Sequence, residues 1–241
     1  MQRRKFLQHT GALLLVAPRL APAAPAVIPR EVAGISVPQT ARARAACAYA
    51  RASCPPFLFN HCMRTYLFGA LTLTRQARRF AAEDAFIASA LHDLGLLPPF
   101  ESPQGSFETD GANAAEAWAL AHGASTSAAD RIWHAVQLHD GAWALTRRQG
   151  AEARLVALGA GTDVDGPQPG ELTDAQIADV LQAFPRLEFK RQFTTLLIAH
   201  CQRKPDSQHA TWLEGLCSAH AHATRPPQAV EQAIMAAPFS E

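Results

Sequence analysis

The chain has 241 residues, a formal net charge of +1, and 18% charged residues. This length is sufficient for one large hydrophobic core, and the near-neutral charge argues against a nucleic-acid-binding surface. Tyrosine occurs only twice and no run of alternating β-branched residues is present, whereas Ala, Leu, Gln and Arg are frequent. The composition therefore predicts an all-α protein.

The N-terminal segment has the pattern of an export signal. The basic stretch Met1–Gln8 precedes the short apolar run Gly11–Ala17, and small Ala-Pro-Ala triplets follow. This is the order of a secretory signal peptide, and the apolar run is too short to span a bilayer. Arg3-Arg4, followed by Phe6-Leu7, resembles a twin-arginine signal. We therefore predict a signal peptide over residues 1–26, transient contact with the export machinery, and a bacterial periplasmic location without a stable membrane anchor.

The rest of the chain has the periodicity of successive helices. We expect a linker over residues 27–38 and a single helical bundle over residues 39–241. Apolar residues recur at helical spacing between Pro- or Gly-containing breaks, with a loop over residues 100–110. The expected helices cover 40–53, 57–78, 82–97, 111–122, 127–146, 151–161 and 173–184, two further segments between 188 and 223, and a short one after Pro227.

The five cysteines, at positions 47, 54, 62, 201 and 217, lack the spacing of a zinc finger. An oxidising compartment permits disulfides, so Cys47–Cys54 and Cys201–Cys217 are candidate pairs. We expect Cys62 to act as a small buried hydrophobic residue.

A set of histidines and aspartates in apolar surroundings is the main chemical signal of the sequence. His92 and Asp93 are adjacent in an apolar helix, and an ionised carboxylate is costly to bury unless it is paired, hydrogen-bonded or metal-bound. Taken alone, this dipeptide is equally explained by a polar pair that the backbone satisfies. However, His61 lies within a second apolar helix and Asp163 ends a run of small residues, with Asp165 as the alternative. Two nitrogen and two oxygen ligands suit one divalent transition metal, with zinc first and iron or manganese as alternatives.

The motifs around these residues resemble those of the HD-domain metalloproteins. They are most similar to the cyanamide hydratase family, which adds water to a nitrile to give urea. The resemblance spans roughly residues 37–215 and rests on the order of several short motifs: Asn60-His61-Cys62-Met63-Arg64, Leu91-His92-Asp93, Ser106-Phe107-Glu108 with Gly111, His139, Thr162-Asp163, Phe184-Pro185-Arg186-Leu187 and Arg203-Lys204-Pro205. It implies an HD-type helical bundle whose metal ligands are His61, His92, Asp93 and Asp163.

The same resemblance suggests roles for three residues beside the metal. His139 matches a family histidine near the substrate and is our candidate catalytic acid or base. Its alternative role is to support the ligands by a hydrogen bond. Phe107 and Glu108 would line the substrate pocket from the loop, unless Glu108 caps the next helix. Cys62 stands where the family usually has serine, which places a departure next to the expected site.

The function predicted from the resemblance is that of a metal-dependent hydro-lyase. Metal-activated water would add to a small-molecule substrate, with a nitrile such as cyanamide as the first candidate. The alternatives are a phosphohydrolase or phosphodiesterase, the commonest activity of the wider HD superfamily, and a metal-binding protein without turnover. Phosphate esters require a cationic clamp, and Arg64 is the one basic residue close to the ligand motifs. The sequence leaves open the physiological substrate, the number of ions and whether the protein forms a homo-oligomer.

Overall fold

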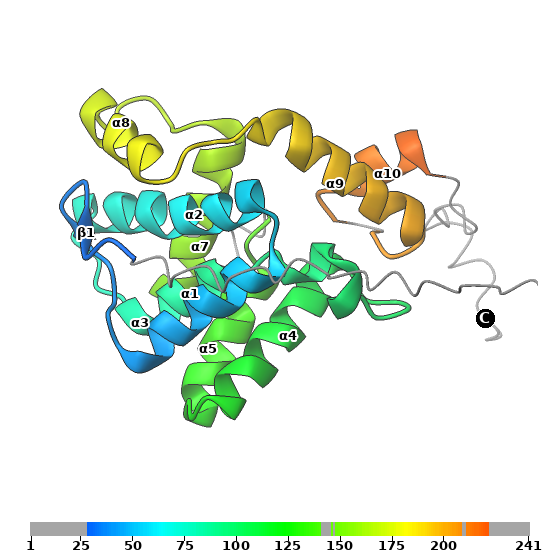
Figure 1. Ribbon diagram of the computed structural model, residues 1–241, viewed down its shortest axis with the longest axis horizontal. Coiled ribbons are helices and arrows are strands. Elements are labelled where there is room, and N and C mark those ends of the chain that lie inside the picture. The colour runs from blue at the N-terminus through cyan, green and yellow to red at the C-terminus, as the bar shows by residue number, and fades with distance from the viewer. Residues whose placement is uncertain (1–27, 141–145, 147, 209–210, 222–241) are drawn as a thin grey trace, which may run out of the picture.

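The computed structural model describes residues 28–140, 146, 148–208 and 211–221, and Figure 1 shows their arrangement. The predicted signal peptide and the helix expected after Pro227 lie outside these residues. The described chain is helical apart from one small hairpin, which confirms the predicted all-α bundle. Its α-helices are α1 (Ala41–Ser53), α2 (Pro56–Arg75), α3 (Ala82–Leu91), α4 (Phe107–Ala121), α5 (Thr126–Gln137), α7 (Ala151–Asp165), α8 (Asp174–Ala183), α9 (Phe189–Arg203) and α10 (Glu214–His220). None of these described helices is both long enough and apolar enough to span a bilayer.

Helices α2 and α7 pack against each other at the centre of the bundle. Figure 1 shows α8 on one side of this pair and α4 and α5 on the other. Glycines permit the close approach, because a Cβ atom on Gly69 would lie 2.1 Å from the Leu155 carbonyl oxygen, and one on Gly159 would lie 1.8 Å from that of Thr65. The crossing also brings two site candidates together: His61 of α2, one turn before Thr65, lies next to Asp163 of α7, one turn after Gly159.

Replacing Gly159 with alanine is expected to destabilise the fold by about 3 kcal/mol or more, because the two backbones must separate to admit the methyl group. The better helix propensity of alanine, about 1 kcal/mol, does not offset this cost. Urea denaturation measures the change. Gly215→Ala in α10 is the matched control, since a Cβ atom there meets nothing within 4 Å. Equal unfolding free energies for the two variants would contradict the role of Gly159.

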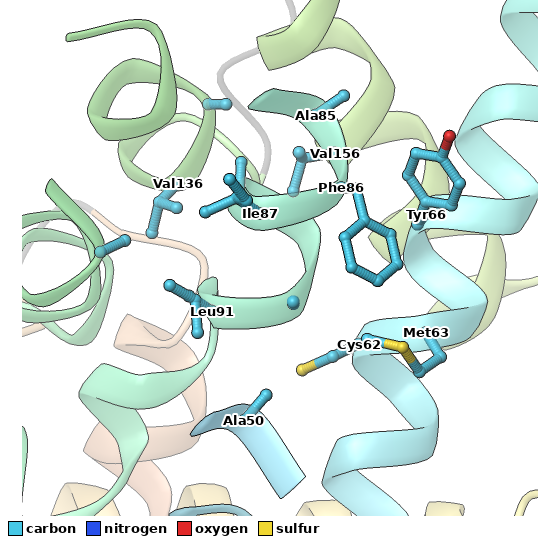
Figure 2. Packing of buried hydrophobic residues seen from close by; sticks show 14 of the residues in the cluster. Ala50, Cys62, Met63, Tyr66, Ala85, Phe86, Ile87, Leu91, Val136 and Val156 are labelled. Atoms are coloured by element: carbon cyan, nitrogen blue, oxygen red, sulfur yellow. The ribbon is translucent and has the colours of Figure 1, made fainter. Parts of the chain in front are cut away.

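Helix α3 lies inside the bundle, and every residue from Asp84 to Leu91 is buried. It packs against α1, α2, α4, α5 and α7. Figure 2 shows Ile87 and Leu91 on one side of the helix, the side of Val136, and Phe86 on another, where its ring meets Tyr66 of α2 edge-on at 5.2 Å between centroids. A helix surrounded in this way holds its last residues rigidly, which fixes the position of the His92-Asp93 pair that follows it.

Several predicted helix ends were wrong, and the local residues explain the differences. The helix predicted over 82–97 ends at Leu91 and is followed by the 3-10 turns η1 (Leu94–Leu96) and η2 (Pro98–Phe100). Gly95 packs directly on the chain at Phe107, where a Cβ atom would lie 2.0 Å from the carbonyl oxygen. Helix α4 starts at Phe107 instead of Gly111, because the side chain of Ser106 accepts a hydrogen bond from the Thr109 backbone N–H.

Two other helices differ in length from the prediction. Helix α5 ends at Gln137, so His139 lies in the turn after it and not on its face. Helix α7 continues to Asp165, four residues past its predicted end, which places Asp163 in its last turn. Both changes affect residues that were expected to serve the metal site.

The segment that we expect to be a linker forms, in its described part, a small antiparallel hairpin. Strands β1 (Glu31–Val32) and β2 (Ile35–Ser36) pair with Val32 opposite Ile35, and both of these side chains are buried. The hydroxyl of Tyr66 donates a hydrogen bond to the Ser36 carbonyl oxygen at 3.2 Å. The hairpin is therefore a packed element of the bundle.

The cysteines behave partly as predicted. Cys201 of α9 and Cys217 of α10 form a disulfide, which confirms this candidate pair. Cys47 and Cys54 are free and buried, so the other candidate pair does not form. Cys62 is free and fully buried in the core, as expected for a small hydrophobic side chain.

Candidate metal centre

Three potential ligand atoms meet between α2 and the end of α3. The Nε2 atoms of His61 and His92 are 3.2 Å apart, and Oδ2 of Asp93 lies 3.4 Å from the first and 3.3 Å from the second. Within the described part of the chain, these residues form the group of His, Cys, Asp and Glu side chains that can share an ion. Donors about 2.0–2.1 Å from a tetrahedral metal lie about 3.3 Å from one another. The three separations therefore fit a divalent transition metal.

The orientation of both imidazoles is fixed from their other ring nitrogen. Nδ1 of His92 lies 2.8 Å from the carbonyl oxygen of Ser89, one turn earlier in the chain. Nδ1 of His61 lies 2.7 Å from Oδ2 of Asp163. Each contact leaves Nε2 facing the shared position. Oδ2 of Asp93 is buried and has no hydrogen-bond partner, which is unfavourable for a carboxylate oxygen unless a cation occupies the position.

The protonation states of these groups also suit a metal. Burial lowers the pKa of His92, so the neutral, ligating form is favoured. Burial by itself would raise the pKa of Asp93, but the neighbouring imidazoles, His92 first, lower the pKa well below its usual range. The site thus combines a neutral imidazole with an ionised carboxylate.

Asp163, the fourth predicted ligand, lies at the Nδ1 edge of the His61 ring. Besides that contact, its Oδ2 accepts from Nη2 of Arg64 at 2.7 Å, while Oδ1 accepts from Nε of Arg64 at 2.8 Å and from Nη1 of Arg186 at 2.7 Å. Burial opposes the charge, but the donors from His61 and Arg64 lower the pKa of Asp163 well below the usual value. Asp163 is not part of the three-residue group, so its role as a direct ligand stays a prediction.

His139 lies next to Oδ1 of Asp93, the carboxylate oxygen that does not face His61 and His92. Its Nδ1 lies 2.5 Å from the Val136 carbonyl oxygen, its Nε2 lies 3.6 Å from Oδ1 of Asp93, and its ring meets that of His92 edge-on at 4.7 Å. Burial lowers the pKa of His139, but the Asp93 carboxylate outweighs this effect and raises the pKa to about 9. The structure therefore brings the candidate acid or base to the metal-ligand cluster.

A cavity of about 140 Å³ opens beside the cluster, smaller than the roughly 300–1,000 Å³ of typical pockets for drug-sized ligands. Its lining is mainly apolar and includes no Lys or Arg among the described residues: His61, His92, Asp93, Phe107, His139, Asp140, Ala157, Ala160, Gly161, Val164, Asp165, Phe193 and Trp212. Phe107 lines this cavity from the first turn of α4 and not from a loop, and its contact with a substrate stays a prediction. Glu108 is buried and does not line this cavity.

Sequence reasoning missed several of the lining residues. The only sequence feature that pointed to Asp140 was its position directly after His139. Asp165 lines the cavity although it was considered only as an alternative to Asp163. Phe193 of α9 and Trp212 before α10 gave no signal, because an apolar residue that faces a pocket looks in sequence like one that faces the core.

Comparison with known proteins adds no assignment to this geometry. No family model matches the chain, and a search of curated proteins finds no match either. The metal centre is therefore inferred from the buried donor set itself, and the HD-domain relationship stays a resemblance between sequence motifs.

Proposed function

We propose that this protein is a metal-dependent hydratase that adds water to a small uncharged nitrile, such as cyanamide, to give urea. The observation that carries the proposal is the position of the candidate ligands at the wall of a small, mainly apolar cavity. A cavity of this size and lining favours a compact neutral molecule. The family resemblance supplies the reaction class.

His61, His92 and Asp93, whose donor atoms meet in the structure, would hold the ion. Two imidazoles and a carboxylate suit zinc, with iron and manganese as alternatives. Once bound, such an ion supplies a Lewis acid that lowers the pKa of water toward about 7. Because the three ligands line the cavity, a substrate in the cavity would lie next to the ion.

The protein side chains would control the proton and the surroundings of the nitrile. In hydration, the water oxygen bonds to the nitrile carbon, one C–N π bond breaks, the water gives up one proton and the nitrogen takes one up. The resulting isourea becomes urea when its O–H proton moves to nitrogen. His139 lines the cavity and can carry this proton on Nε2. Phe107 and Phe193 cover the apolar side and limit access of bulk water to the reacting carbon.

The contacts of Arg64 weigh against the phosphohydrolase alternative. Its guanidinium is fully buried, with Nε and Nη2 on Asp163 and Nη1 on the carbonyl oxygens of Phe184 and Pro185. All three of its guanidinium nitrogens therefore bind protein groups, and none is directed toward a substrate. Asp140 and Asp165 in the cavity lining would also repel a phosphate ester. A purely metal-storing protein is less supported, because its ligands would not be expected to line a cavity.

The reaction is tested with the full chain loaded with zinc, iron or manganese and incubated with cyanamide, with urea measured over time. We expect metal-dependent urea formation, and a loss of about 10²–10⁴-fold in kcat for His139→Gln at unchanged metal content. His134→Gln, on the outer part of α5, is the matched control and should keep full activity. Absence of urea with every metal, or hydrolysis of bis-p-nitrophenyl phosphate in its place, would reject the hydratase.

A further inference from the structure

Asp163 has a bonding pattern different from that of a metal ligand. We propose that Asp163 acts on the metal centre through His61, as a positioning residue that fixes the tautomer and orientation of the imidazole, and does not bind the ion itself. The inference rests on the metal site of the proposed function and not on the reaction that takes place there.

The first argument is the number of donors around the carboxylate. Oδ1 accepts from Arg64 Nε and Arg186 Nη1, and Oδ2 accepts from Arg64 Nη2 and His61 Nδ1, all at 2.7–2.8 Å. A carboxylate offers about four acceptor positions in total. All four are in use, so none is left for a cation. The side chain is also completely buried, which excludes exchange of these partners for water.

The second argument is the contrast with Asp93. This aspartate is equally buried, yet its Oδ2 has no hydrogen-bond partner and lies within 3.4 Å of both Nε2 atoms. Two buried aspartates therefore lie on opposite edges of the His61 ring, one saturated with donors and one with a free oxygen. The free oxygen is placed to bind the metal, and the saturated carboxylate is placed to hold the ring.

The third argument is the tautomer. Because an ionised carboxylate can only accept, the hydrogen of His61 lies on Nδ1 and the lone pair on Nε2 is free for an ion. His92 is held in the same way, with the Ser89 carbonyl as the acceptor. Outer partners of this kind orient metal-bound histidines and usually change metal affinity by about 10–100-fold.

The arginines explain how Asp163 keeps its place. Arg64 lies three residues after His61 on α2, so the two side chains share a face. Its fork binds the carboxylate through two nitrogens, which fixes the plane of the carboxylate as well as its position. Arg186 adds a third contact from the segment between α8 and α9, and its side chain is 31% exposed. The outer end of the network can therefore be altered without opening the core.

The test uses the full chain loaded with Co²⁺, whose visible absorption reports the coordination number. For Asp163→Asn we expect unchanged band intensity, an affinity for Co²⁺ reduced by about 10–100-fold, and faster water exchange of the His61 Nδ1–H signal in the paramagnetic proton NMR spectrum. Asp84→Asn is the matched control, because it disrupts another Asp–Arg pair, with Arg131 at 2.7 Å, two turns before His92. It should leave the affinity and both spectra as in the wild type.

Arg186→Gln provides a second, milder variant if Asp163→Asn does not fold. It removes one donor from Asp163 and should lower the Co²⁺ affinity several-fold without a change in the visible spectrum. A lower coordination number in Asp163→Asn would show that Asp163 is a ligand and overturn the proposal. Unchanged affinity in the variants that fold would also overturn it. These readouts do not depend on urea formation, so a failure of the hydratase assay leaves this test intact.

Discussion

Replacing His92 with alanine is expected to remove the divalent ion from the purified protein. His92 supplies one of three donor atoms that lie 3.2–3.4 Å apart, and its loss leaves two. Loss of an outer hydrogen-bond partner typically costs 10–100-fold in metal affinity, so loss of a direct ligand should cost on the order of a thousandfold or more. Elemental analysis and zinc titration by calorimetry measure the change. Urea formation, if the protein is a hydratase, should fall with the metal content.

The control for this variant is another buried histidine outside the cluster. His200 is fully buried and bonds to Glu101 and Gln208, so His200→Ala tests general damage to the core. Zinc should raise the melting temperature of the wild type and of His200→Ala, but not that of His92→Ala, because only a folded protein that binds the ion is stabilised by it. Stoichiometric zinc in purified His92→Ala would refute the proposed centre.

The helices of the bundle could be predicted from sequence better than their ends. Periodic apolar residues place α2, α3 and α7, since a buried helix face requires them. The ends depend on contacts between distant segments. The turn after α3 is set by Gly95 packing on the chain at Phe107, and α5 stops before His139. The local sequence carries no pattern that predicts either of these two helix ends.

The candidate metal ligands were predictable for a physical reason. His61 lies in an apolar helix and His92 and Asp93 directly follow another, and the cost of burying these polar groups alone indicates a shared partner. Their meeting point was not predictable from periodicity, because it depends on how α3 packs against α2. The close crossing of α2 and α7 at Gly69 and Gly159 brings Asp163 to His61 in the same way.

Asp163 shows most clearly what could not be predicted from the sequence. The sequence indicates that this aspartate belongs near His61, and the structure places the two side chains 2.7 Å apart. Which edge of the imidazole it meets is a matter of side-chain direction, set by Arg64 and Arg186. A motif gives residue types and spacing but not this direction. Ligand and support are therefore separated only by the three-dimensional contacts.

The second large effect is expected from Glu108, a buried carboxyl group in the first turn of α4. Both of its oxygens lack a hydrogen-bond partner. Burial raises its pKa from 4.5 to about 8, and the nearby Asp140 adds to the rise. Below pH 4.5 the group is protonated in both the folded and the unfolded chain. Between about 4.5 and 8 only the folded chain keeps the proton, so stability is lost as the pH rises through this window.

Glu108→Gln should therefore become more stable relative to the wild type as the pH increases, because glutamine keeps the shape of the protonated acid but cannot ionise. At about 1.4 kcal/mol for each pH unit, the difference in unfolding free energy should grow by on the order of 4 kcal/mol between pH 5 and pH 8. Urea denaturation of both proteins at several pH values, without added metal, measures it. Titrating groups that do not interact with Glu108 cancel in the difference, which therefore reports Glu108 together with its neighbour Asp140. A difference that stays constant over this range would show that Glu108 is ionised in the folded protein.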